Sequence, residues 1–180
     1  MTNTASSETK HGMLTGLFRD RDSAERAYQV VSDRGYTKHD VNLVMSDDTR
    51  QRHFSHSHSV ETELGNKAAE GAGVGGAVGS TIGAIAAAIA AMGTSLVLPG
   101  LGLIVAGPLA AGIAGAGAGG VTGGLIGALI GWGIPEERIK HYEAGIRDGG
   151  ILMAVKPHSD EDAKYLEQQW KQHDGEHVFL

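Results

Sequence analysis

The sequence predicts an α+β protein with a ferredoxin-like split β-α-β head and an inserted, all-helical glycine-zipper hairpin. Two observations predict this fold. Each end of the chain carries a short apolar run, an amphipathic helical pattern and a second apolar run. Between Glu70 and Glu136 the chain contains no Asp, Glu, Lys or Arg. Charged flanks around an uncharged, glycine-rich centre indicate two different chemistries in one chain.

The first half of the head is expected over residues 13–46, after a polar, disordered tail at residues 1–12. Apolar residues at 13–18 and 41–45 are typical of two short strands. The residues between these strands recur at the spacing of one helix face: Ala24, Ala27, Tyr28 and Val31.

Short polar side chains and a glycine mark the ends of this first helix. Asp22 or Ser23 can cap its N-terminus, because a side-chain oxygen satisfies the free amides of the first turn. Gly35 can adopt the left-handed conformation that ends a helix. These signals predict one β-α-β unit.

The second half of the head is expected over residues 135–180. A helix over 136–147 precedes an apolar strand over 151–155. Ser159 is expected to cap the next helix and Gly175 to stop it. The apolar stripe of that helix consists of Ala163, Leu166 and Trp170, flanked by Tyr165. The last strand is expected at the C-terminus, over residues 177–180.

Placed side by side, the two units predict one sheet with its helices on one face. The chain between them, a polar His-containing linker or helix over 47–70 and the hairpin over 71–134, is then an insertion between the middle strands. Its two ends are expected to emerge close together. The alternative is that the two flanks form unrelated layers.

Two rows of glycines spaced by four residues occupy the insertion, and residues four apart lie on one helix face. Each row is expected to form a groove that lets another backbone approach closely. The first row is Gly71, Gly75, Gly79 and Gly83, and the second is Gly115, Gly119, Gly123, Gly127 and Gly131. This spacing predicts close helix packing, against the other arm or against another subunit.

The two helical arms are expected over residues 71–92 and 108–132, each long enough to cross a bilayer. The connection over 93–107 is unusually apolar for an exposed turn. One interpretation is that this connection is a short re-entrant piece. The alternative is that the second arm starts near Leu101 and is kinked at Pro108. A membrane-inserted hairpin is favoured, with a soluble homo-oligomer that buries the hairpins in its centre, or a switch between the two, as alternatives.

Composition excludes several function classes. The chain has no cysteine, and its basic residues form no patch, so Cys-based catalysis and nucleic-acid partners are not expected. No spacing indicates a catalytic set or a cofactor site, and the protein is expected not to be an enzyme. His53, His56 and His58 could bind a divalent metal, which leaves a metal- or ligand-binding sensor as a further alternative.

Several segments resemble one family of bacterial general stress proteins, the heat-induced stress protein YflT-like family. They include Gly16-Leu17-Phe18-Arg19-Asp20, Asp40-Val41-Asn42-Leu43-Val44 and Gly131-Trp132-Gly133-Ile134-Pro135. The resemblance implies a role in stress responses and supplies no cofactor or binding residue. We therefore expect a self-assembling protein of the bacterial cytoplasm that associates with inner-membrane lipid.

Overall fold

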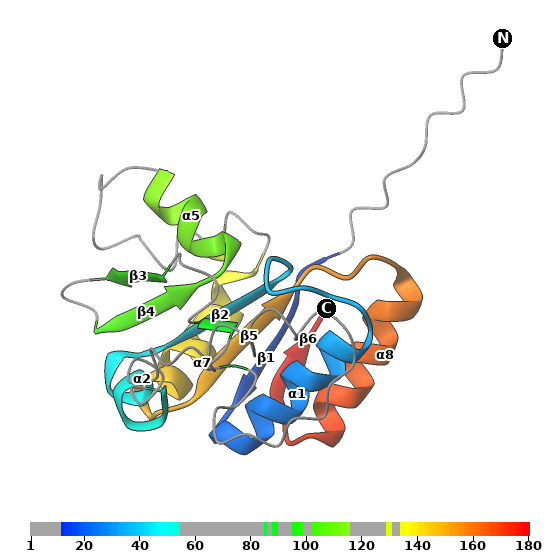
Figure 1. Cartoon of the computed structure of the whole chain (residues 1–180), viewed down its shortest axis with the longest axis horizontal. Helices are drawn as coiled ribbons and strands as arrows, with labels where there is room; N and C mark the ends of the chain where they lie inside the picture. The colour runs from blue at the N-terminus through cyan, green and yellow to red at the C-terminus, as the bar shows by residue number, and fades with distance from the viewer. Residues whose placement is uncertain are drawn as a thin grey trace, which may run out of the picture.

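The computed structural model describes residues 12–54, 85, 88–89, 95–98, 102–115, 129–130 and 134–180 of the chain. In this part the protein is α+β, with one antiparallel sheet of six strands in the order β3-β4-β2-β5-β1-β6 (Figure 1). The strands are β1 (Leu14–Phe18), β2 (Val41–Ser46), β3 (Ser95–Leu98), β4 (Leu103–Ala106), β5 (Ile151–Val155) and β6 (Glu176–Phe179). The helices are α1 (Arg21–Asp33), α2 (Asp47–Phe54), α5 (Pro108–Gly115), α7 (Glu136–Arg147) and α8 (Asp160–Gln172).

Both flanks of the chain enter this one sheet. β1 from the first flank lies between β5 and β6 from the second, and β5 also pairs with β2. The alternative of two unrelated layers is therefore wrong. Met45, near the end of β2, lies opposite Ile151, the first residue of β5. The strands that flank the insertion thus end and begin at neighbouring points of the sheet, as the sequence predicted.

α1 and α8 lie side by side over one face of the sheet, which we call the α1 face (Figure 1). Trp170 of α8 is fully buried there, and its ring meets Phe18 edge-on with centroids 5.6 Å apart. Its indole N–H donates to the carbonyl of Ala27 over 3.2 Å, so this buried polar group is satisfied. The predicted stripes of both helices are buried, and Tyr165 is exposed beside its stripe.

The opposite face, which we call the α7 face, is also covered. Leu17, Val44 and Leu152 point from the sheet into a second core beneath α7 and α5. Thr15 and Tyr142 share a hydrogen bond of 2.7 Å in this layer. The expectation of helices on one face is therefore wrong. β1 and β5 are buried along their whole length, so both of their faces need cover.

The helix ends match the sequence in part. Gly35 has a φ of +89°, and Ser159 caps α8 by accepting from the amide of Asp162, as expected. The cap of α1 is Asp20, whose carboxylate accepts from the amide and the hydroxyl of Ser23. The expectation of Asp22 or Ser23 was thus wrong by two or three residues. After α8 the left-handed residue is Asp174, with a φ of +59°, and Gly175 does not adopt this conformation.

The insertion contains strands, which corrects the prediction that residues 71–134 are all helical. β3 and β4 form a hairpin within the predicted apolar connection, and β4 pairs with β2 from Leu43↔Ala106 to Ser46↔Leu103. β4 carries the β-branched residues Ile104 and Val105, which favour a strand once a sheet edge is available. α5 begins at Pro108, where the second arm was expected, so an earlier start with a kink at Pro108 is wrong.

Described residues from the two predicted arms lie on opposite faces of the sheet. Ile85 and Ala88 are buried in the core of the α1 face, whereas Leu109 and Leu129 are buried in that of the α7 face. These points of the insertion therefore contact the sheet rather than each other. No helix in the described part of the chain has the length and apolar character to cross a membrane.

Candidate functional site

The residues singled out from the sequence lie mostly outside the described part. His53 is an exposed residue of α2, while His56 and His58 lie outside the described residues. Within the residues that the structure describes, no three His, Cys, Asp or Glu side chains are grouped to hold a metal ion.

Of the two glycine rows, only Gly115 is described, as the last residue of α5. The other eight glycines lie outside the described residues: Gly71, Gly75, Gly79, Gly83, Gly119, Gly123, Gly127 and Gly131. The glycine-zipper hypothesis therefore continues to rest on the sequence pattern.

The structure shows where the head holds the insertion on the α7 face. Asn42 of β2 is buried, and its side-chain carbonyl accepts from the amide of Leu109 over 2.7 Å. Its amide group faces the carbonyl of Ala154 on β5 at 3.4 Å. Leu109 is in the first turn of α5, where backbone amides lack helical partners. Asn42 therefore caps α5 from the middle of the sheet, in place of a residue of the helix itself.

Gly107 makes this approach possible. It has a φ of +102°, which side-chain-bearing residues rarely adopt. A Cβ at this position would also collide with the backbone carbonyl of Val41 and meet the side-chain oxygen of Asn42 at 3.0 Å. The chain between β4 and α5 thus passes directly against β2, and only glycine fits there.

A second polar contact holds the insertion on the α1 face. The carboxylate of Glu25, on α1, accepts from the backbone amide of Ile85 over 2.8 Å. Arg21 lies one turn earlier, with its guanidinium 3.6 Å from the other carboxylate oxygen of Glu25. Ile85 itself is fully buried beside Ala88. The head thus binds described residues of the insertion through a polar side chain on each face, and we call Asn42 and Glu25 the docking pair.

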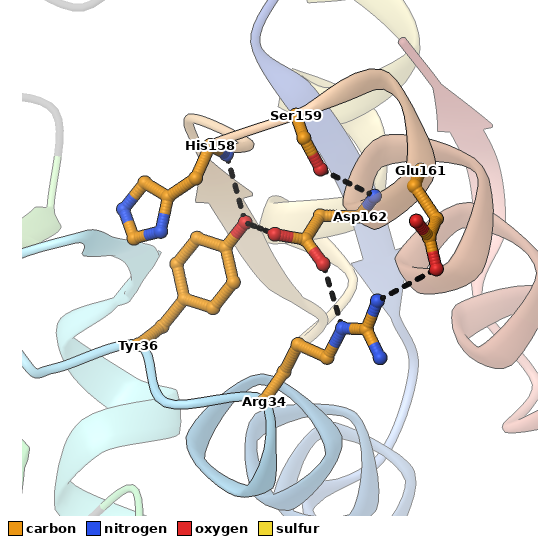
Figure 2. Close-up of polar contacts among 6 residues, drawn as sticks. All are labelled: Arg34, Tyr36, His158, Ser159, Glu161 and Asp162. Carbon is orange, nitrogen blue, oxygen red and sulfur yellow. Dashed lines mark hydrogen bonds and ion pairs between the residues drawn. The ribbon is translucent and has the colours of Figure 1, made fainter.

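A separate polar cluster joins the two halves of the head at the loops between α1 and β2 and between β5 and α8 (Figure 2). The hydroxyl of Tyr36 donates to Asp162 over 3.1 Å and accepts from the backbone amide of His158 over 2.9 Å. The His158 ring stacks on Tyr36 with centroids 4.2 Å apart. Tyr36 therefore links both loops through its ring and its hydroxyl.

Charge completes the cluster. The Arg34 guanidinium donates to the carboxylate of Asp162 over 2.6 Å and lies 3.6 Å from Glu161 (Figure 2). This hydrogen bond from Arg34, with a further one from Tyr36, holds the pKa of Asp162 below its ordinary value. Burial raises the pKa of the Tyr36 phenol. The ionised carboxylate of Asp162 and the protonated hydroxyl of Tyr36 are already hydrogen-bonded to each other. This arrangement favours a structural role for the cluster over a role in proton transfer.

The sequence pattern did not single out Asp162, Asn42, Glu25 or Tyr36 as functional residues. A signal for Asn42 exists, since it is the one polar residue within the apolar run from Val41 to Met45. Glu25 and Tyr36 carry no such signal, because their partners lie far away in the sequence.

Comparison of the chain with protein-family models, with curated proteins and with solved structures finds no match. The docking pair and the cluster of Arg34, Tyr36, His158 and Asp162 are therefore interpreted from their own geometry.

Proposed function

We propose that the protein is a non-enzymatic, stress-associated bacterial protein that self-assembles through its glycine-patterned insertion, in or on the inner membrane. The observation that carries this proposal is the charge-free stretch between Glu70 and Glu136 with its two glycine rows. Uncharged helices with small residues every four positions pack closely on other helices in lipid. The stress role rests on the resemblance to the YflT-like family.

The head is proposed to be ferredoxin-like. The strand order β2-β5-β1-β6, with α1 and α8 over one face, supports a split β-α-β unit. In this proposal α7 and the β3–β4 hairpin are additions to that unit. The sheet then acts as a platform from which the rest of the insertion, including the proposed helical hairpin, extends.

The docking pair explains how the sheet would hold the insertion in place. Asn42 and Glu25 each accept a hydrogen bond from a backbone amide of the insertion. They therefore position the backbone of the insertion and do not depend on which side chains it carries. Each contact lies in a different core, and each therefore positions a different part of the insertion. In the proposed assembly the head fixes these points while the glycine rows pack against other helices.

A soluble homo-oligomer is the second candidate. The burial of Ile85, Leu109 and Leu129 against the sheet favours it, because protein already covers these apolar side chains without lipid. In that case the glycine rows pack between copies in water. Both candidate functions involve self-assembly. They differ in whether lipid or water surrounds the assembled protein.

Alkaline carbonate washing of the membrane fraction distinguishes the candidates. Retention in the pellet is expected for an inserted hairpin, and complete release would contradict insertion. Oligomer size is then compared in mild detergent and in detergent-free buffer. Assembly in detergent supports packing within lipid, whereas assembly only without detergent supports the soluble oligomer.

Paired substitutions test the glycine rows directly. Gly79→Leu combined with Gly123→Leu should reduce oligomer size, because leucine fills both grooves. Ala144→Leu is the control, since Ala144 is an exposed residue of α7, outside the insertion in sequence. Equal oligomer size for both variants would show that the grooves are not the contact.

A further inference from the structure

The two edges of the sheet differ in chemistry. At one end β3 pairs with β4 and, in the described part of the chain, with no other strand. Its four residues, Ser95–Leu98, carry no charge. Val97 is 53 % exposed, the most exposed large apolar residue among those described. An uncharged edge with an exposed apolar side chain can accept another strand.

The opposite edge, β6, carries features that discourage strand addition. Glu176 forms an ion pair with Arg19 over 2.9 Å, and both side chains are substantially exposed. His177 has a φ of +49°, and the pairing of β6 with β1 shifts register between Thr15 and Leu17. Charges and irregular pairing are the devices by which proteins protect sheet edges. β3 has neither.

The β3 edge is also regular. Each of its four residues pairs in sequence with a residue of β4, from Ser95↔Ala106 to Leu98↔Leu103. β4 in turn pairs without a shift to β2, near the middle of the sheet. Neither ladder on this side of the sheet contains a register shift, so the outward N–H and C=O groups of β3 are expected to follow the regular antiparallel pattern.

We propose that β3 pairs with β3 of a second copy, so that two sheets join into one continuous antiparallel sheet. Isologous contacts are the commonest form of homo-oligomer, and a strand running antiparallel to its own copy satisfies that symmetry. The occupant is a second copy because the edge needs an extended, uncharged strand, and β3 of the partner has that character. Charge repulsion does not oppose this pairing.

Symmetry determines the register. A twofold axis perpendicular to the sheet keeps each face of one copy continuous with the same face of the other. Residues opposite one another in a ladder point to the same face, so the axis must pass through a residue pair of equal number. Centring it on Val97 places this exposed side chain against Val97 of the partner subunit, which removes both from water.

This interface goes beyond the proposed function, because it uses neither lipid nor the glycine rows. The β3 interface can therefore form even if the glycine rows make no contact between copies, and the glycine rows can pack even if the β3 interface does not form. The chain has no cysteine, so one introduced thiol reports one contact.

Val97→Cys tests the register. Directly opposed residues of an antiparallel pair have Cα atoms about 4.5–5.5 Å apart, within the range that a disulfide spans. Oxidised glutathione should convert most of this variant to a covalent dimer. His177→Cys places an exposed thiol on the β6 edge and is the control, for which little dimer is expected. Equal cross-linking of the two variants would overturn the proposal.

Val97→Lys tests the interface without a covalent bond. Lysine on an edge strand opposes pairing, so the sedimentation mass in detergent-free buffer should fall by half. Circular dichroism checks that the fold is retained, and if it is not, the cysteine result decides. An unchanged mass in a folded Val97→Lys variant would overturn the β3 interface.

The glycine double variant separates the two proposals. In a chain with Gly79→Leu and Gly123→Leu, the Val97→Cys cross-link should persist at its original yield. Loss of the cross-link in that background would show that the β3 contact depends on the glycine rows, and it would overturn the independent interface proposed here.

Discussion

Asn42 shows how one polar side chain connects two distant parts of the chain. It lies on β2 among the apolar residues Val41 to Met45, and it is 3 % exposed. A polar group buried this deeply is tolerated because both ends of its side chain have partners, on α5 and on β5. The same residue therefore stabilises the sheet and positions the insertion.

Replacing Asn42 by alanine should destabilise the protein by about 1–3 kcal/mol, because the buried amide of Leu109 loses its acceptor. Urea unfolding measures the change, and hydrogen exchange should show faster exchange at Leu109 than in wild type. Gln29→Ala, on the exposed side of α1, is the control and should change stability by less than about 0.5 kcal/mol. Equal effects of the two substitutions would contradict the docking role.

Asp162 predicts a specific dependence of stability on pH. Its pKa is lowered in the folded protein, first by Arg34, so the unfolded chain binds this proton more readily. Its stabilising contribution is therefore complete above about pH 4, the ordinary range of an aspartate, and is lost as the pH falls through the lowered pKa. Tyr36 loses its ionised acceptor in the same range.

The variant Asp162→Asn should be less stable than wild type at pH 7, and this difference should shrink as the pH falls below about 4. Urea unfolding at a series of pH values measures it. Glu161→Gln is the control, because the Glu161 side chain is 88 % exposed and should show little difference at any pH. A constant difference for Asp162→Asn would exclude this ion pair as the cause.

At the scale of elements, α7 depends on a glycine for its distance from the sheet. Gly145 lies in the helix interior, where glycine costs about 1 kcal/mol relative to alanine. A Cβ at this position would collide with the side chain of Leu17, which is itself fully buried. Close packing against β1 therefore outweighs helix propensity at this position.

Two adjacent substitutions in α7 separate packing against the sheet from helix propensity. Gly145→Ala should destabilise by about 1–3 kcal/mol, because the new methyl group displaces the side chain of Leu17, which is fully buried in the core. Ala144→Gly, on the exposed side of the same turn, should cost about 1 kcal/mol through propensity alone. Thermal or urea unfolding measures both. A stabilised Gly145→Ala variant would contradict the packing.

The elements also show why some helix ends were predicted correctly and others were not. Ser159 and Gly35 act through local geometry, which a sequence displays directly. Asp20 and Asp22 are equally suitable caps by residue type, and only the path of the chain after β1 selects Asp20. At the end of α8 a Cβ at Gly175 would lie 2.6 Å from the carbonyl of Trp170, so this glycine serves packing.

At the scale of the whole molecule, the described residues of the insertion are part of the head. It adds β3 and β4 to the sheet and places Leu109 and Leu129 in the core of the α7 face. The strands of both flanks are nevertheless contiguous, since β2, β5, β1 and β6 are neighbours without it. The head should therefore fold without the insertion, at lower stability.

Replacing residues 55–134 by a flexible linker tests this expectation. The shortened chain should unfold cooperatively at a lower urea concentration than the full chain. It should also bind a hydrophobic dye, because Leu103, Val105 and Leu109 no longer cover the α7 face. The full chain under the same conditions is the control. A shortened chain with no cooperative transition would show that the insertion is required for folding.

The sequence by itself determined the strands and helices of both flanks, their apolar faces and the uncharged character of the insertion. These follow from local periodicity, from capping residues and from where charges stop, all of which a single chain displays. Tertiary structure alone decided that β3 and β4 pair beside β2, that helices cover both faces, and that Asn42 and Glu25 bind the insertion. The physical reason is that a short apolar run can form a helix or a strand, depending on what it packs against. Beside an open sheet edge, its backbone N–H and C=O groups are satisfied by pairing with that edge. The presence of such an edge cannot be read from the local sequence.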